Sequence, residues 1–330
     1  MQEYERDSVL EQYDIVADST RKTRGAILCD TDKGLLILKE VAVSSAKLPA
    51  LFELYEYLAS QGYVKADYPI KNREGEYVSF SQTGDKYLLR QWSYGRECNV
   101  HNTAELLKAA GNLAKLHILM RKEMENHVPA VMHLKEEYMR HNRELKKVRK
   151  FIRGVSPKGE FEFVFLKYFD KMYYLADTAL NMMEESDYDE LYQESVRESH
   201  IMHGEYNYHN ILITQASAPS EMMTVNFDRM KKGVQTEDLY YFLRKVMEKH
   251  GWRERLGDSI MNAYSAIKPL NKKEIEYLKL RLTYPEKFWK IADSYYRSNK
   301  AWISVKNIEK MNMAVRQAEE KERFLNNVFL

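Results

Sequence analysis

The residues HGEYNYHNILIT, His203–Thr214, decide the fold of this chain. An apolar lead-in enters a polar turn, and the turn leaves through an apolar strand at 211–213. A Ser/Ala/Pro-rich loop follows, and a second short strand at 222–225 delivers Asn226 and Asp228. The pattern therefore predicts carboxylates, amides and imidazoles at neighbouring strand ends. Phosphoryl transfer uses such an arrangement to position a hydroxyl and to hold Mg²⁺ on a nucleotide.

This stretch resembles the aminoglycoside-phosphotransferase and choline-kinase group of kinase-like proteins. Their catalytic loop reads H-G-D-x-x-x-x-N, and a D-[FW]-[DE] triplet follows it. The resemblance implies an α+β, two-lobed protein-kinase-like fold, with a small antiparallel-sheet N-lobe and a large helical C-lobe. It implies ATP and Mg²⁺ as candidate cofactors. It assigns a catalytic role to Glu205, His203 and Asn210, and a metal-binding role to Asn210, Asn226 and Asp228.

Two positions depart from the pattern of the group. Glu205 stands where the group has its catalytic aspartate, and a shift of about 1 Å in a catalytic group can cost around 100-fold in rate. Asn226 stands where a metal-binding aspartate begins the triplet, and a neutral amide oxygen is a weak Mg²⁺ ligand. Together the two changes weaken both the base and the metal site.

The first ninety residues predict a small sheet with one helix. Apolar runs at 25–29 and 34–40 flank the turn residues Asp-Thr-Asp-Lys-Gly, a hairpin signal. Residues 48–61 have the apolar period of a helix and are followed by Gly62, a residue that often ends a helix. A second hairpin is expected from 77–81 and 87–92. This order of strands and helix is that of a kinase-like N-lobe.

Lys39 ends an apolar run of that lobe, so its ammonium needs an anionic partner. In the family the equivalent lysine contacts nucleotide phosphates and pairs with a helix glutamate. Glu53 is the preferred candidate for that glutamate and Glu56 the second. The alternative is a lysine that ends a strand in solvent. Between residues 15 and 25 only one glycine occurs, so a glycine-rich phosphate loop is absent from the sequence.

Residues 89–98 resemble the linker between the lobes, so we predict an N-lobe at 1–94 and a helical C-lobe at 95–330. Backbone groups near Gln91 and Trp92 would face an adenine ring, unless the segment is an ordinary turn from strand to helix. From Thr103 the sequence is helical, and a basic helix is predicted at 134–151. It is either a solvated face or a surface for an acidic partner.

Three side chains outside the loop have predicted structural roles. His117, at the end of an apolar helical stripe, is expected to be packed and hydrogen-bonded. Thr236 is a candidate cap for the helix that follows it. Asp238 resembles the family's aspartate that braces the catalytic loop.

The C-terminal third resembles CotS-type spore coat proteins, which are kinase-like proteins of endospore-forming bacteria. The most specific segment outside the catalytic loop is YPEKFWK, 284–290. An aromatic cluster is also expected here to close the C-lobe core, from Phe288, Trp289, Tyr295 and Trp302. The resemblance implies other spore coat proteins as partners, besides a nucleotide.

Composition excludes several classes of function. The net charge of +2 gives no reason to expect nucleic acid or an anionic membrane as partner. No apolar run reaches the ~18–20 residues of a membrane span, and the acidic, polar N-terminus does not resemble a signal peptide. Two distant cysteines match no metal spacing. Together with these exclusions, the resemblance to spore coat proteins implies a protein of the mother-cell cytoplasm that is assembled on the spore coat.

Two hypotheses follow. The first is a pseudokinase that serves as a structural or assembly component of the endospore coat. The second is an active ATP-dependent phosphotransferase, acting on a small molecule or a protein, with Glu205 as base and Asp228 with Asn210 for the metal. The double departure at the site favours the first.

Overall fold

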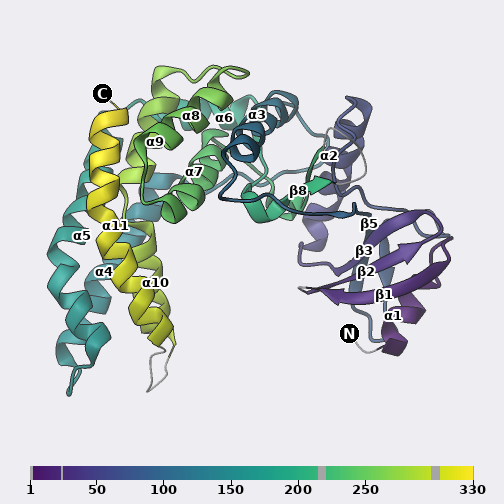
Figure 1. Cartoon of the computed structure of the whole chain (residues 1–330), viewed down its shortest axis with the longest axis horizontal. Helices are drawn as coiled ribbons and strands as arrows, with labels where there is room; N and C mark the ends of the chain where they lie inside the picture. The colour runs from purple at the N-terminus through teal and green to yellow at the C-terminus, as the bar shows by residue number, and fades with distance from the viewer. Residues whose placement is uncertain (1–2, 24, 215–220, 299–304, 330) are drawn as a thin grey trace.

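A five-stranded antiparallel sheet forms the N-terminal part of the molecule (Figure 1). The structure, a computed structural model, describes residues 3–23, 25–214, 221–298 and 305–329. The strand order is β1-β2-β3-β5-β4. The strands are β1 (Ala17–Thr23), β2 (Ala26–Thr31), β3 (Gly34–Glu40), β4 (Val78–Phe80) and β5 (Lys86–Gln91), with helix α1 (Glu3–Leu10) before them and α2 (Leu48–Ser60) after β3.

Local sequence explains most of this sheet. The β2–β3 hairpin pairs Thr31 with Gly34, and Gly34 has the positive φ that the tight turn requires. The α2 helix begins with a proline in its first turn and buries its apolar face. Both hairpins and α2 are confirmed, whereas α1 and β1 were not predicted. Strand β1 is almost wholly exposed and polar, so it has no apolar alternation to reveal it.

The rest of the described chain is mainly helical, and the predicted mixed α+β fold with a large helical part is confirmed. Two hydrophobic cores support it, one around α2, α3 and α7 and one around α4, α5 and α10. The helices are α3 (Thr103–Leu119), α4 (Leu134–Gly154), α5 (Glu160–Glu185), α6 (Tyr188–Arg197), α7 (Thr236–His250), α8 (Glu254–Ser265), α9 (Lys272–Thr283), α10 (Glu286–Arg297) and α11 (Val305–Val328).

Two small sheets carry the loop that the sequence singled out. Strand β6 (Gly95–Glu97) pairs with β8 (Ile211–Thr214), which pairs with β9 (Met222–Thr224). Strands β7 (Ile201–Met202) and β10 (Lys231–Lys232) pair on the other side of the loop. The predicted lobe boundary at residue 94 thus falls between β5, in the large sheet, and β6, which pairs with the later part of the chain. The Ser/Ala/Pro-rich loop between β8 and β9 lies outside the described residues.

The expected aromatic cluster of the C-terminal third is confirmed for its described members. Phe288 stacks on Phe165, Trp289 stacks on His141, and Tyr295 packs on Phe161. These contacts join α10 to α4 and α5, which run side by side with α11 in Figure 1. Trp302 lies outside the described residues.

Thr236 does not cap α7, contrary to the prediction. The N-cap position is Gln235, and the Thr236 hydroxyl is buried without a hydrogen-bond partner among the described residues. The Gln235 amide instead donates to the carbonyl oxygens of His117 and Ile201, which joins α3 to β7. In the described part of the chain no helix is long and apolar enough to span a membrane.

Candidate functional site

Helix α7 holds the turn at His203 and Gly204, where the site begins. The Asp238 carboxylate accepts hydrogen bonds from the backbone nitrogens of both, at 2.7 and 2.8 Å. The predicted brace between α7 and the loop is therefore confirmed. Gly204 has φ +82° and a Cβ there would overlap the Arg229 carbonyl oxygen, so only glycine fits. The His203 ring lies 3.0 Å from the Val225 carbonyl oxygen, which joins the loop to β9.

His117 extends the same brace. Its ring nitrogens lie 2.7 Å from the Tyr264 hydroxyl and 3.3 Å from the Asp238 carboxylate. The ring is fully buried, and burial lowers the pKa of His117 below its ordinary value. The prediction of a packed, hydrogen-bonded histidine is confirmed.

Asn210 and Asn226 bind each other through their side chains. The Asn226 amide nitrogen donates to the Asn210 side-chain oxygen at 2.8 Å, and the Asn210 amide nitrogen donates to the Glu205 carbonyl oxygen at 2.9 Å. Asn226 adopts the left-handed backbone conformation, φ 67° and ψ 56°, which asparagine tolerates better than most residues. Its turn aims Asn226 and Asp228 toward the N-terminal sheet.

Lys39 reaches these two residues from β3. Its ammonium donates to the Asn226 side-chain oxygen at 2.9 Å and lies 3.7 Å from the Asp228 carboxylate. The side chain is 31% exposed, so the ammonium is partly accessible to solvent where the sheet meets the loop. The sequence left open a solvent-exposed lysine at the end of a strand. The structure instead has this lysine in contact with the site.

Glu53 does not pair with Lys39, and that preferred pairing is wrong. Its carboxylate accepts hydrogen bonds from the backbone nitrogens of Glu125 and Asn126 and from the Asn126 amide, at 2.7–2.9 Å. Burial alone would raise the pKa of Glu53, but these hydrogen bonds outweigh it and lower the pKa. The second candidate, Glu56, accepts from the Tyr77 hydroxyl instead. Glu53 therefore fastens α2 to the segment after α3.

Arg90 is one of three residues of the site that the sequence analysis missed, together with Asp67 and Lys47. Its guanidinium donates to Asp228 at 2.6 Å and to Asp67 at 2.9 Å, and the residue is only 2% exposed. Asp67 also accepts from the Asn226 backbone nitrogen and from the Tyr55 hydroxyl. A signal was present, since an arginine inside the apolar run YLLRQW must be buried with an acid partner.

The electrostatics of Asp228 follow from these contacts. Burial would raise the pKa of its carboxyl group, but Arg90 and then Lys39 outweigh burial and hold the pKa below its ordinary value. One carboxylate oxygen faces Arg90 and the other faces Lys39. In addition, the Lys47 ammonium donates to the Asp228 backbone carbonyl oxygen at 2.8 Å, and burial lowers the pKa of Lys47 to about 8.

This arrangement does not fit a Mg²⁺ ion. Mg²⁺ requires free, hard oxygen ligands, usually from one or two carboxylates. Here the Asp228 carboxylate is paired with two cations, and the side-chain oxygens of Asn226 and Asn210 both accept hydrogen bonds. Among the described residues, His, Cys, Asp and Glu form no group of three or more that could hold a metal ion.

Glu205 keeps its carboxylate free. Its backbone carbonyl oxygen accepts from Asn207 and Asn210, but the described residues offer its side chain no hydrogen bond or ion pair. Its charge acts on Tyr241 of α7, whose pKa is raised first by burial and also by the Glu205 carboxylate. A partly buried carboxylate without a partner is a costly feature, so it is a functional candidate.

The linker residues Gln91 and Trp92 already use their backbone donors. The Gln91 nitrogen donates to the Tyr68 carbonyl oxygen and the Trp92 nitrogen to that of Leu35, at 2.8 and 3.0 Å. The Trp92 side chain packs on the small apolar cluster of Leu212, Met223 and Val225. These apolar residues come from β8, from β9 and from the position directly after β9.

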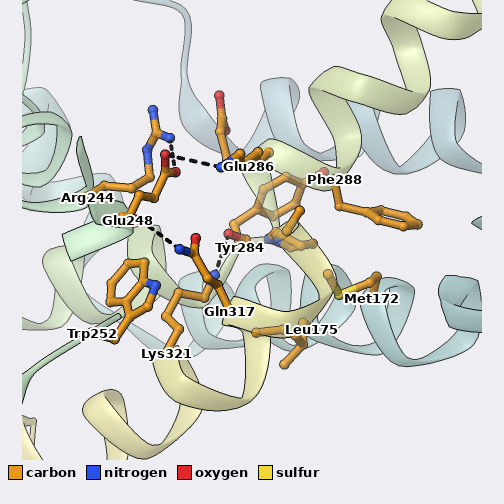
Figure 2. Close-up of a pocket in the computed structure, with 14 residues that line it drawn as sticks. Met172, Leu175, Arg244, Glu248, Trp252, Tyr284, Glu286, Phe288, Gln317 and Lys321 are labelled. Atoms are coloured by element: carbon orange, nitrogen blue, oxygen red, sulfur yellow. Dashed lines mark hydrogen bonds and ion pairs between the residues drawn. The ribbon is translucent and has the colours of Figure 1, made fainter. Parts of the chain in front are cut away.

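The later turns of α7 carry Arg244 and Glu248, which line a cavity (Figure 2). The Arg244 guanidinium lies 5.5 Å from the centre of the Tyr241 ring and donates to Glu248 at 2.7 Å. The cavity beyond it, of about 40 Å³, has room for a few water molecules. Its wall includes the YPEKF part of the segment that resembles spore coat proteins.

The charges around this cavity are mostly paired with one another. Glu248 faces Arg244 and also Lys287 at 3.6 Å, and Glu286 pairs with Lys290 at 2.8 Å. Lys321 donates to the Tyr284 carbonyl oxygen, and burial lowers the pKa of Lys321 to about 8. The Glu248–Lys287 pair thus joins α7 to α10.

Comparison with known proteins gives one family for nearly the whole chain. The family model described as "Spore coat putative kinase YutH" matches residues 6–328. Spore coat protein S of Bacillus subtilis (strain 168) is 26% identical over 180 residues, which are 52% of this chain and 48% of that protein. The chain therefore matches about half the length of that relative.

Solved structures with a similar fold include phosphotransferases. An aminoglycoside phosphotransferase from Alicyclobacillus acidocaldarius superposes with a TM-score of 0.85 at 17% identity, covering 98% of this chain and 94% of that one. A spectinomycin phosphotransferase in complex with ADP and spectinomycin gives a TM-score of 0.67 at 12% identity, covering 96% and 97%. At such identities the likeness concerns the fold, and it agrees with the predicted kinase-like architecture.

Proposed function

The chain belongs to the YutH family of kinase-like spore coat proteins, and from this premise we propose that it is a pseudokinase that serves as a structural or assembly component of the endospore coat. Its partners are then other coat proteins, and its place is the mother-cell cytoplasm followed by the coat. The similarity to spore coat protein S supports the coat as its final location.

One observation carries the proposal. The Asp228 carboxylate, which would have to bind a metal ion on a nucleotide, is already paired with two cations of the chain. Arg90 lies 2.6 Å and Lys39 3.7 Å from it. For Asp228 to bind Mg²⁺, at least one of these contacts must break. A metal ion at Asp228 would also be repelled by the cations of Arg90 and Lys39. Arg90, Lys39 and Asp228 therefore stabilise the lobes against each other without a metal.

A thermal-shift titration with ATP tests the proposal. Ligands that bind the folded state raise the melting temperature in proportion to ln(1 + [L]/Kd). We expect no rise that depends on Mg²⁺ or Mn²⁺, and Lys39→Met is the control for metal-independent binding of the phosphates. A metal-dependent rise that disappears in Lys39→Met would contradict the proposal, because it would require an intact nucleotide site.

The second candidate function is an active phosphotransferase with Glu205 as base. It is favoured by the partly buried Glu205 carboxylate, which has no hydrogen bond or ion pair among the described residues. Metal would then have to reorganise Asn210, Asn226 and Asp228.

Kinetics of two loop variants test this second function. Glu205→Gln keeps the shape and removes the proton acceptor, so an active chain loses most of its turnover, about 100-fold. Glu205→Asp raises the rate if the extra methylene is the defect. Glu254→Gln, at an exposed position on α8, is the matched control. Unchanged turnover in Glu205→Gln would remove Glu205 from the role of base.

A further inference from the structure

The outer face of α4 carries three exposed cations at helical spacing. Arg143, Lys147 and Lys150 follow one another at i, i+4 and i+7, so they lie on one side of the helix over about 10 Å. None of the three has an ion pair or a hydrogen bond to a side chain within the described ranges. The helix holds eight Lys or Arg residues against three Glu, a net charge of +5, in a chain whose total is +2.

Other cations of α4 form ion pairs or cation–π contacts with side chains of α5. Lys135 pairs with Glu184 at 3.0 Å, and Arg149 pairs with Asp170 at 3.0 Å. The Lys146 ammonium lies 5.0 Å from the centre of the Tyr173 ring. One cationic side of α4 therefore contacts α5, and the cations of the other side have no side-chain partner among the described residues. A merely solvated face would need neither this separation nor the run of like charges, which repel each other at helical spacing.

Two exposed apolar side chains flank the open cations. Met139 is 41% exposed and Phe151 is 49% exposed, and twelve residues separate them, about 18 Å along the helix. The Phe151 ring meets the edge of Tyr296 from α10, which holds it in place while leaving half of it in solvent. Cations between two apolar side chains fit a ligand with carboxylates between two apolar groups.

The positive area is narrow. The acids of α5 that border it are themselves exposed, with 79% of the Asp170 side chain and 50% of the Glu184 side chain accessible. A membrane or a nucleic acid presents a broad negative surface and would meet these carboxylates as well as the cations. A single polypeptide segment can follow one helix face and avoid them.

We propose that the outer face of α4 binds an acidic segment of a partner polypeptide. Its carboxylates pair with Arg143, Lys147 and Lys150, and apolar side chains on either side of them pack on Met139 and Phe151. The surface is separate from the loop at His203, so binding here stands whether or not the chain binds a nucleotide.

Fluorescence anisotropy with a designed peptide tests this surface. The probe is a fluorescein-labelled helical peptide with Glu at i, i+4 and i+7 and Leu at both ends, and the same peptide with Gln is its control. We expect the Glu peptide to bind, with an affinity that falls as salt is added. The triple variant Arg143→Glu, Lys147→Glu and Lys150→Glu should bind about tenfold more weakly or worse.

A control variant with the same charge change separates a local surface from overall charge. Lys249→Glu, Arg255→Glu and Arg316→Glu reverse three exposed cations on other elements, and binding should stay within about twofold of wild type, well under the 1.4 kcal/mol of a tenfold change. Circular dichroism verifies that both variants fold. If the Glu triple unfolds, the neutral triple to Gln replaces it, because Gln has a helix propensity close to that of Lys and Arg.

Three outcomes would overturn the proposal. Equal binding by the α4 triple and wild type would place the peptide elsewhere, and equal loss in both triples would show a non-specific charge effect. Tighter binding to phosphatidylserine vesicles or to double-stranded DNA than to the Glu peptide, lost in the α4 triple, would assign the face to a membrane or a nucleic acid instead.

Discussion

Arg90 neutralises two carboxylates at the contact between the N-terminal sheet and the catalytic-like loop. It holds Asp67 and Asp228 from the buried side, while Lys39 meets Asp228 from the open side. Burial would lower the pKa of Arg90, but its anionic neighbours outweigh burial and raise the pKa. The guanidinium is therefore charged at any pH at which the protein is folded.

Arg90→Met should strongly destabilise the fold. The methionine fills similar space but leaves Asp67 and Asp228 without their shared cation, and breaking a buried pair costs roughly 3–5 kcal/mol. Urea denaturation of the variant against wild type measures the loss. Arg96→Met, which removes an exposed pair with Glu105, should change the free energy of unfolding little. Similar small losses in both variants would contradict a central role for Arg90.

Asn226→Asp should introduce metal dependence. The new carboxylate adds a charge and a hard oxygen ligand beside Asn210, so ATP should bind about tenfold more tightly with Mg²⁺ than without. Asn226→Ser, which adds no charge, is the control, and calorimetry compares the three proteins. Equal, metal-independent binding in all of them would show that Asn226 is not the limiting defect, which would leave the Arg90–Asp228 pair as the obstacle.

At the scale of elements, α7 organises the site. Its first turn carries Asp238, which accepts hydrogen bonds from His203 and Gly204 of the loop. Its later turns carry Arg244, which contacts both the Tyr241 ring and the Glu248 carboxylate. The helix therefore sets both the position of Glu205 and the cavity at the C-terminal helices. Helix α2 also fixes a neighbouring segment, because Glu53 accepts hydrogen bonds from the backbone nitrogens of Glu125 and Asn126 after α3.

Asp238→Asn should loosen the loop. The amide can accept only one of the two backbone hydrogen bonds well, and hydrogen bonds to a charged group contribute about 1.5–3 kcal/mol each. We expect a lower melting temperature and faster amide hydrogen exchange at Gly204 and Glu205. Asp258→Asn, on the exposed side of α8, should leave both unchanged. Normal protection of the loop in Asp238→Asn would show that β7 and β10 suffice to hold it.

At the scale of the whole molecule, buried histidines make the fold sensitive to acid. His141 stacks on Trp289 inside the second core, and burial lowers the pKa of His141 to about 4. An unfolded histidine has a pKa near 6.5. As the pH falls below about 6.5, the unfolded chain takes up a proton that the folded chain does not, so the free energy of unfolding decreases until the pH reaches about 4.

His141→Phe should reduce this acid sensitivity. It keeps a ring on Trp289 and removes the titrating group, so the loss of stability between pH 7 and pH 5 should be smaller by roughly 2 kcal/mol. Urea denaturation at the two pH values measures it. His127→Asn, at an exposed position, is the matched control. An unchanged pH dependence in His141→Phe would mean that other groups, among them His200 with a pKa near 4, account for the acid effect.

The sequence by itself determined the elements whose signals are local. The β2–β3 turn, the face of α2 and the glycine of the catalytic-like loop follow from backbone conformation and periodicity within a few residues. The Asp238 brace was also predictable, through the resemblance of its motif. Strand β1 was not, because an exposed, polar edge strand has no apolar period, and its pairing with β2 is what makes it a strand.

Only the tertiary structure decided which charges meet. Asp228 lies 138 residues from Arg90 and 189 from Lys39 along the chain, and a buried cation requires an acid partner without specifying which one. Because β3 and β5 pack against the loop, Asp228 becomes the partner of both cations. Because α2 packs against the segment after α3, Glu53 binds backbone nitrogens there and does not pair with Lys39. The character of the site thus depends on contacts between distant segments, whose choice of partner is a property of the folded chain.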